Sequence, residues 1–167
     1  MDKIWEKFVR IAEDNDGVIR TSQVEAAGIS RPMLKKYMDL GKLERIRKGL
    51  YIVSGEVADE YVLLQAQNTK AIFSYGTALF FWGLSDRTPH ILDVTLPQGL
   101  NATVLRKNNP NIRCHYIVND LYELGITELM SPQGGTVRLY DKERCICDLI
   151  RDKEKIETVS YTHLRAH

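Results

Sequence analysis

The chain has 167 residues, of which 44% are apolar and 27% charged, and its formal net charge is +1. This is the composition of a globular protein with enough apolar residues for a core, and the whole-chain charge gives no sign of nucleic-acid binding. The longest apolar run, TALFFWGL at residues 77–84, is far too short to span a bilayer, and the N-terminus lacks the apolar stretch of a secretory signal. We therefore expect a cytoplasmic protein without a membrane partner.

The N-terminal third of the chain has the pattern of a helix-turn-helix. Apolar residues at helical spacing predict a first helix within residues 1–15. A short second helix is expected over residues 22–27, where Gly28 can take the left-handed conformation that ends it. Ser30 can cap a third helix, because its side-chain oxygen accepts a hydrogen bond from a backbone N–H of the first turn.

The helix that follows Ser30 separates apolar from basic side chains. At about 100° per residue, its apolar residues gather on one side: Met33, Leu34, Tyr37 and Leu40. Three basic residues gather on the opposite side: Arg31, Lys35 and Lys42. A recognition helix in the major groove needs this division, because one side packs on the protein while the other contacts phosphates and base edges. The alternative interpretation is the solvated face of an ordinary amphipathic helix.

A basic hairpin follows. Strands are predicted at residues 43–46 and 50–53, with Arg47, Lys48 and Gly49 as the tip between them. Residues 20–54 hold eight basic and three acidic side chains, a net charge of +5, whereas residues 55–167 have a net charge of −2. A confined positive charge is expected of one DNA-facing surface. The predicted DNA-binding residues are Arg31, Lys35, Lys36, Lys42, Arg45, Arg47 and Lys48.

The predicted fold class is α+β, with a winged helix-turn-helix over residues 1–54 and a small mixed α+β domain over residues 55–156. In the second domain, helices are expected over residues 58–68, 74–83 and 142–155, and strands over residues 90–96, 113–118 and 136–140. The helix over residues 74–83 is apolar nearly all round and should be buried. The expected core of this domain is Phe80, Phe81, Trp82, Ile146 and Leu149.

The second domain shows no pattern of a metal site. The three cysteines are Cys114, Cys145 and Cys147. Their C-x-C spacing does not suit a zinc site and there is no second pair, so we expect buried free thiols. His90 and His115 have no nearby ligand pair and are interpreted as structural.

No catalytic arrangement can be proposed from residue spacing either. Asp148 and Asp152 are expected on an exposed face of the last helix, paired with Arg144 and Arg151. We therefore expect no enzymatic activity and no cofactor. The alternative is a nucleic-acid-acting enzyme for which the winged helix delivers substrate.

Five segments, taken in their order, resemble the AbiEi-type antitoxins of type IV toxin–antitoxin systems. These segments are KLERIRKGLYIV, SYGTALFFWGLSDRTPH, VTLP, YELGITE and VRLYDKERCICDLIRDK. The resemblance extends to about Lys155. It implies a repressor that binds operator DNA through its winged helix and regulates its own operon. It also implies that the second domain counteracts a nucleotidyltransferase toxin without a stable complex, in defence against phage.

One alternative to an antitoxin role stays open. A plain winged-helix transcription factor, with a second domain that senses a ligand or a partner, is the main alternative to an antitoxin. The sequence shows no coiled-coil seam and assigns no oligomeric state.

The final VSYTHLRAH does not continue the preceding helical pattern and resembles vector or adapter read-through. Residues 157–167 are therefore predicted to be a non-native or disordered tail, with the native C-terminus missing.

Overall fold

The computed structural model describes residues 2–152 and divides into two compact units, Met1–Gln67 and Asn68–His167. The sequence placed the domain boundary after Ser54, where a turn does occur, with Gly55 at a φ of 88°. The structure assigns the following helix, α4 (Glu60–Gln67), to the first unit. A turn signal therefore did not coincide with the division between units. The prediction for residues 157–167 lies outside the described residues.

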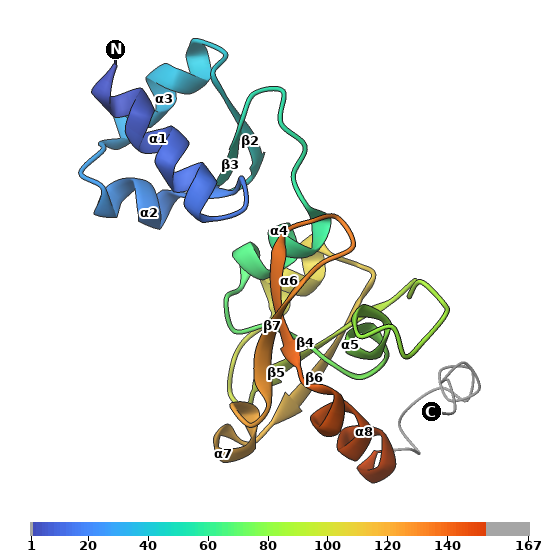
Figure 1. The fold of residues 1–167 in the computed structure, drawn as a ribbon. Coiled ribbons are helices and arrows are strands. Elements are labelled where there is room, and N and C mark those ends of the chain that lie inside the picture. The colour runs from blue at the N-terminus through green and yellow to red at the C-terminus, as the bar shows by residue number, and fades with distance from the viewer. Residues whose placement is uncertain (1, 153–167) are drawn as a thin grey trace. The chain divides into compact units, whose positions relative to one another are not determined.

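The first unit has the arrangement of a winged helix (Figure 1). Three helices precede the hairpin: α1 (Lys3–Asp14), α2 (Thr21–Ala26) and α3 (Arg31–Asp39). The strands β1 (Ile19–Arg20), β2 (Leu43–Arg47) and β3 (Leu50–Val53) form an antiparallel sheet in the order β1-β3-β2. The predicted helix-turn-helix and hairpin are thus confirmed.

Local signals explain where these helices begin and end. The Asp2 carboxylate caps α1 by accepting hydrogen bonds from the backbone of the first turn. Gly28, at a φ of 79°, ends α2, and the Ile29 N–H then donates to the Val24 carbonyl at 3.1 Å. The Ser30 side chain caps α3. The three helices and the sheet enclose one core: Phe8, Ala12, Ile19, Val24, Ile29, Leu34, Tyr37, Leu43 and Tyr51.

The second unit is a mixed sheet with helices. Its strands are β4 (Ile72–Phe73), β5 (Leu92–Pro97), β6 (Ile112–Ile117), β7 (Ile126–Met130) and β8 (Thr136–Tyr140), in the order β6-β5-β4-β8-β7. The pairs β5–β6 and β4–β8 are parallel, whereas β4–β5 and β7–β8 are antiparallel. The helices are α5 (Tyr75–Phe81), α6 (Thr103–Asn108), α7 (Asn119–Tyr122) and α8 (Lys142–Arg151). The expected α+β class is confirmed.

The core of the second unit differs from the prediction. Its central strands supply the buried residues, which include Phe73, Val94, Leu96, Val137, Leu139 and Tyr140. Of the five residues expected in this core, Leu149 is buried, the aromatic residues at 80–82 are half-buried and Ile146 is exposed. The helix α5 is short, and its buried positions include Ala78 and Leu79. The aromatic residues that follow them are therefore only partly covered.

The helix α8 is turned relative to its predicted orientation. Asp148, expected on an exposed face, is only 2% exposed, whereas Ile146 and Ile150 are 46% and 70% exposed. The predicted ion pairs do exist, because Asp148 contacts both Arg144 and Arg151. The side of this helix that faces the protein therefore carries Asp148 beside the apolar Cys145 and Leu149, and the expectation that Asp148 lies on an exposed face was wrong.

The three cysteines differ in exposure, which corrects the expectation that all are buried. Cys145 is buried and Cys147 is exposed. Burial raises the pKa of the Cys145 thiol, which lowers the thiolate fraction available for reaction. We predict that iodoacetamide alkylates Cys147 of the native protein well before Cys145, as read by peptide mass spectrometry. In denaturant both should react alike, and equal native labelling would contradict the burial of Cys145.

Candidate DNA-binding surface

Helix α3 presents one apolar and one basic side, as the sequence indicated. Leu34 and Tyr37 are buried in the core of the first unit, which fixes the rotation of the helix. Arg31, Lys35 and Lys36 are all exposed. Because Arg31 and Lys35 are four residues apart, they lie on the same face near the start of α3, where recognition helices contact bases.

The β2–β3 hairpin forms the wing. Arg45 pairs with Tyr51 in register, but Arg47 pairs with Leu50, so the ladder is irregular between Arg45 and Arg47. Gly49, at a φ of 78°, makes the tight turn that few other residues would adopt. All three basic side chains of the wing are exposed: Arg45, Arg47 and Lys48.

A short link holds the turn of this wing against the start of α2. The Thr21 N–H donates to the Gly49 carbonyl at 3.0 Å, and strand β1 immediately before it pairs with β3. Sequence analysis missed β1, because a strand of two residues is too short to show an alternating pattern. The link orders the wing relative to the helix-turn-helix, which a composite DNA-binding surface requires.

Comparison with known proteins finds a family match within this unit. Residues 6–54 match the family described as "Transcriptional regulator, AbiEi antitoxin". The predicted resemblance to the AbiEi family is confirmed over these residues. The match covers nearly all of the winged helix, from the first turn of α1 through the end of β3.

A solved structure is similar to part of this chain. The crystal structure of the RV2827C protein from Mycobacterium tuberculosis is similar over 71% of this chain and 46% of its own, with 19% sequence identity and a TM-score of 0.45. The chain thus spans less than half the length of that protein. No curated protein matches the chain.

One basic residue of this unit lies away from the predicted surface. Lys42 was grouped with Arg31 and Lys35 by continuing the helical pattern, but α3 ends at Asp39. Gly41, at a φ of 77°, then turns the chain. The Lys42 Nζ lies 5.1 Å from the centre of the Trp5 ring and 5.8 Å from that of Tyr37.

Lys42 therefore belongs to an aromatic cluster beside α1. The rings of Trp5 and Tyr37 are stacked with centroids 5.8 Å apart. The hydrogen bond that Tyr37 donates to Asp2 raises the pKa of the phenol to about 12 and lowers that of the Asp2 carboxyl. Leu40, also expected on the buried side of α3, is 59% exposed for the same reason, since it follows the end of the helix.

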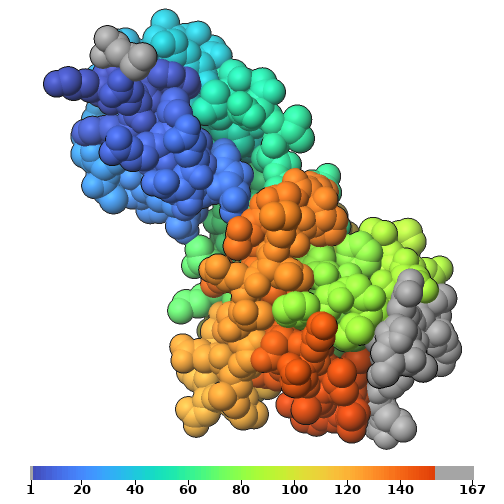
Figure 2. All heavy atoms as spheres, in the orientation of Figure 1, coloured from blue at the N-terminus to red at the C-terminus, as the bar shows by residue number. Residues whose placement is uncertain are grey.

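The basic residues that remain on α3 and the wing are available for contacts. Arg31 pairs with Glu25 at 3.0 Å, but the two side chains are 80% and 49% exposed. An ion pair this exposed contributes little, so Arg31 can exchange Glu25 for a phosphate. Figure 2 shows α3 and the wing as adjoining cyan and teal parts of the surface of the first unit.

Among residues 2–152, no other kind of site is apparent in the first unit. No group of three or more His, Cys, Asp or Glu side chains in the described part of the chain could hold a metal ion. None of the helices formed by these residues is long and apolar enough to cross a membrane. The exposed basic side chains on α3 and the wing are therefore the feature from which a function can be argued.

Proposed function

We propose that this protein is a DNA-binding transcriptional repressor and the antitoxin of a type IV toxin–antitoxin system. The observation that carries the proposal is the exposed basic surface formed by α3 and the wing, on a winged helix that matches the AbiEi family. We name this set, Arg31, Lys35, Lys36, Arg45, Arg47 and Lys48, the basic surface.

The two parts of the basic surface have different roles. Helix α3 enters the major groove, where Arg31 and Lys35 near its N-terminal end reach base edges and flanking phosphates. The wing residues Arg47 and Lys48 contact the phosphate backbone beside that groove and fix the register of the helix. Phosphate contacts supply affinity that does not depend on sequence, so base discrimination resides in α3.

The proposed biological role is supported by the family match of the winged helix. The protein represses its own operon, and its second unit counteracts a nucleotidyltransferase toxin without forming a stable complex. It acts without enzymatic activity or a cofactor, in the cytoplasm of a bacterium, as part of phage defence.

The direct test is binding of the full chain to the DNA upstream of its own reading frame. Fluorescence anisotropy should show saturable binding to this DNA that is at least ~10³-fold tighter than to unrelated duplex of equal length at the same salt. The logarithm of the binding constant should fall linearly with the logarithm of salt concentration. Equal affinity for both duplexes at every salt concentration would contradict a repressor.

The antitoxin role needs a separate test. The full chain is co-expressed with a nucleotidyltransferase encoded next to it, and growth is compared with that of a strain expressing a variant neutralised at the basic surface. We expect both versions to restore growth, because toxin antagonism is assigned to the second unit. Restoration only by the version that binds DNA would mean that protection results from repression. Absence of any such neighbouring gene would favour the plain transcription factor.

A further inference from the structure

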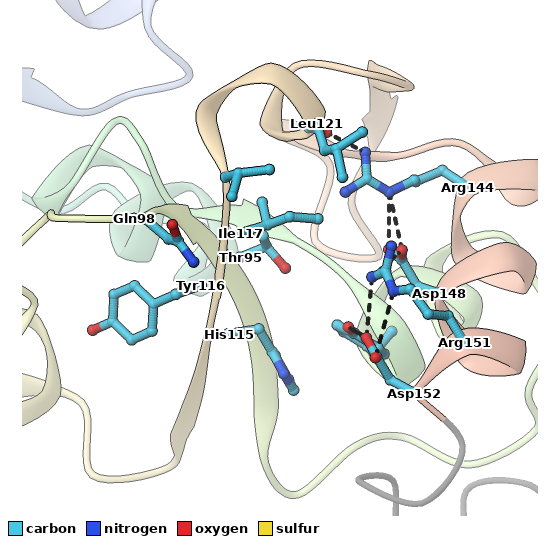
Figure 3. A pocket seen from close by; sticks show the side chains of 12 residues that line it. Thr95, Gln98, His115, Tyr116, Ile117, Leu121, Arg144, Asp148, Arg151 and Asp152 are labelled. Atoms are coloured by element: carbon cyan, nitrogen blue, oxygen red, sulfur yellow. Dashed lines mark hydrogen bonds and ion pairs between the residues drawn. The ribbon is translucent and has the colours of Figure 1, made fainter.

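The second unit contains a pocket of about 550 Å³ between the β5–β6 face and α8 (Figure 3). Thr95 and His115, which are register partners on β5 and β6, lie on the strand side. Arg144, Asp148 and Arg151 lie on the helix side. The volume is within the usual range of about 300–1,000 Å³ for small-molecule sites.

The helix side of the pocket is charged, although the same helix also buries Cys145 and Leu149. As described above, α8 directs Asp148 inward while Ile146 and Ile150 face outward. Burying such charges gains less stability than packing apolar residues of similar volume. A local arrangement that contradicts the apolar pattern of its own helix is expected mainly at functional sites.

Arg144 has one nitrogen that the protein leaves unsatisfied. Its Nε donates to both carboxylate oxygens of Asp148, at 3.1 and 3.0 Å, and its Nη1 donates to the carbonyls of Leu121 and Leu124, both at 2.6 Å. The side chain is only 10% exposed, yet its buried Nη2 has no hydrogen-bond partner among the described residues. Leaving a buried donor without a partner is costly, and more so when the donor is charged.

The Arg144 guanidinium cannot easily rotate to bring its Nη2 to a hydrogen-bond partner. Four hydrogen bonds hold its other two nitrogens, and its central carbon lies 4.3 Å from the centre of the Tyr140 ring. In Figure 3 one nitrogen of Arg144 points away from α8, into the pocket on the side of Ile117. A fixed donor with a buried charge is suited to bind an anionic oxygen.

The acceptors of the same network are already in use. Asp148 accepts from Arg144 and from Arg151, whose Nη2 lies 2.8 Å away. Asp152 accepts from Arg151 and from the Tyr75 hydroxyl. The group that lacks a partner on the helix side is therefore a hydrogen-bond donor, the Arg144 Nη2. A cationic ligand would not satisfy it.

The opposite side of the pocket is also held in place. His115 Nε2 is 2.9 Å from Asp93 Oδ1, and the Tyr75 ring lies 4.2 Å from the His115 ring between centroids. Tyr75 has a φ of 49°, a conformation that is strained for a residue with a side chain and is concentrated at functional sites. This backbone conformation occurs where the Tyr75 side chain reaches both His115 and Asp152.

We propose that this pocket binds a small oxyanionic molecule, an organic carboxylate or a phosphate ester. Its acid oxygen accepts from Nη2 of Arg144, and its apolar part lies against Ile117, Val118 and Leu121, which line the same pocket. The inference does not depend on DNA binding or on toxin antagonism, because it rests only on residues of the second unit.

The test uses the full chain labelled with ¹⁵N and four probes at constant ionic strength: inorganic phosphate, phenyl phosphate, acetate and benzoate. We expect saturable shifts of the Arg144 Nε–Hε signal, with the ring-bearing probe of the preferred acid several-fold tighter than its simple partner. The phosphate and carboxylate pairs distinguish the two sources of the oxyanion. Absence of saturable shifts with all four probes would overturn the proposal.

Matched variants separate binding from folding. Because Arg144→Lys removes the Nε–Hε signal, binding by the variants is read from the backbone amide signals of Ile117 and Leu121. Arg144→Lys keeps the charge but loses the fork of donors and should weaken binding by at least ~10-fold, whereas the same change at the exposed Arg106 of α6 should not. Val118→Trp obstructs the pocket without removing Arg144 and should abolish binding, whereas Val104→Trp, at a 70% exposed position on α6, should leave it intact. Unchanged binding by both Arg144→Lys and Val118→Trp would place the probes elsewhere and refute the site.

Discussion

Simultaneous replacement of Arg31, Lys35, Arg47 and Lys48 by alanine is expected to abolish specific DNA binding at physiological salt. All four side chains are exposed on α3 and the wing. Hydrogen bonds to charged groups contribute about 1.5–3 kcal/mol each, so the combined loss should exceed ~10³-fold in affinity. If all four contact phosphates, the log–log salt slope should also fall by about four, one unit for each contact.

Lysine 42 supplies the control for this experiment. Lys42→Ala removes the same kind of charge from the same unit, but its amine lies over the Trp5 and Tyr37 rings beside α1. Its salt slope should therefore equal that of the unmodified protein, whereas Lys35→Ala should lower the slope by about one. Anisotropy titrations at several salt concentrations measure both, with circular dichroism to confirm folding.

Two outcomes would contradict the assignment. If the quadruple variant binds the upstream DNA as tightly as the unmodified protein, α3 and the wing are not the DNA-binding surface. If Lys42→Ala lowers the salt slope as much as Lys35→Ala, the DNA also reaches the side of α1, and the surface is larger than proposed here.

The winged helix was predictable because its signals are local. Ser30 and Gly28 act within one helical turn of their own positions, as cap and as terminator, and the hairpin needs only neighbouring residues and Gly49. Lys42 was misplaced because a helical periodicity was continued beyond Asp39, where the helix ends. The position of a side chain after a left-handed glycine such as Gly41 depends on the turn and not on the periodicity of the helix before it.

The second unit was less predictable because its signals are not local. Strand β8 alternates clearly and was found, but β4 has two residues, and β7 was passed over although it spans Ile126–Met130. The orientation of α8 was missed because apolar periodicity assumes that the apolar side is buried. Here Asp148 is buried beside Cys145 and Leu149, stabilised by two arginines.

The pocket could not be anticipated from spacing at all. Its strand side comes from two parallel neighbours, β5 and β6, and its helix side comes from α8, far along the chain. His115 was interpreted as structural because no partner is near in sequence, yet Asp93 lies 2.9 Å from it across the ladder. Only the folded sheet brings these residues together.

Asp148→Ala is expected to reduce the unfolding free energy of the second unit by about 3–5 kcal/mol, the usual cost of removing one partner of a buried ion pair. Asp148 is 2% exposed, and its loss leaves the 10% exposed Arg144 side chain without its carboxylate. Ile150→Ala on the same helix is the matched control. Its side chain is 70% exposed, so its effect should remain within about 0.5 kcal/mol.

The two tryptophans allow this measurement on the full chain. Trp5 lies in the first unit and Trp82 in the second, so a Trp5→Phe background leaves Trp82 to report on the second unit alone. The Trp82 Nε1 donates to the Tyr140 carbonyl at 2.9 Å, which couples its fluorescence to the strand that precedes α8. Urea titrations of the two variants in this background give both free energies. A loss for Asp148→Ala no larger than that for Ile150→Ala would mean that Asp148 is not the buried partner of Arg144, and the charged side of the pocket would not be held as described.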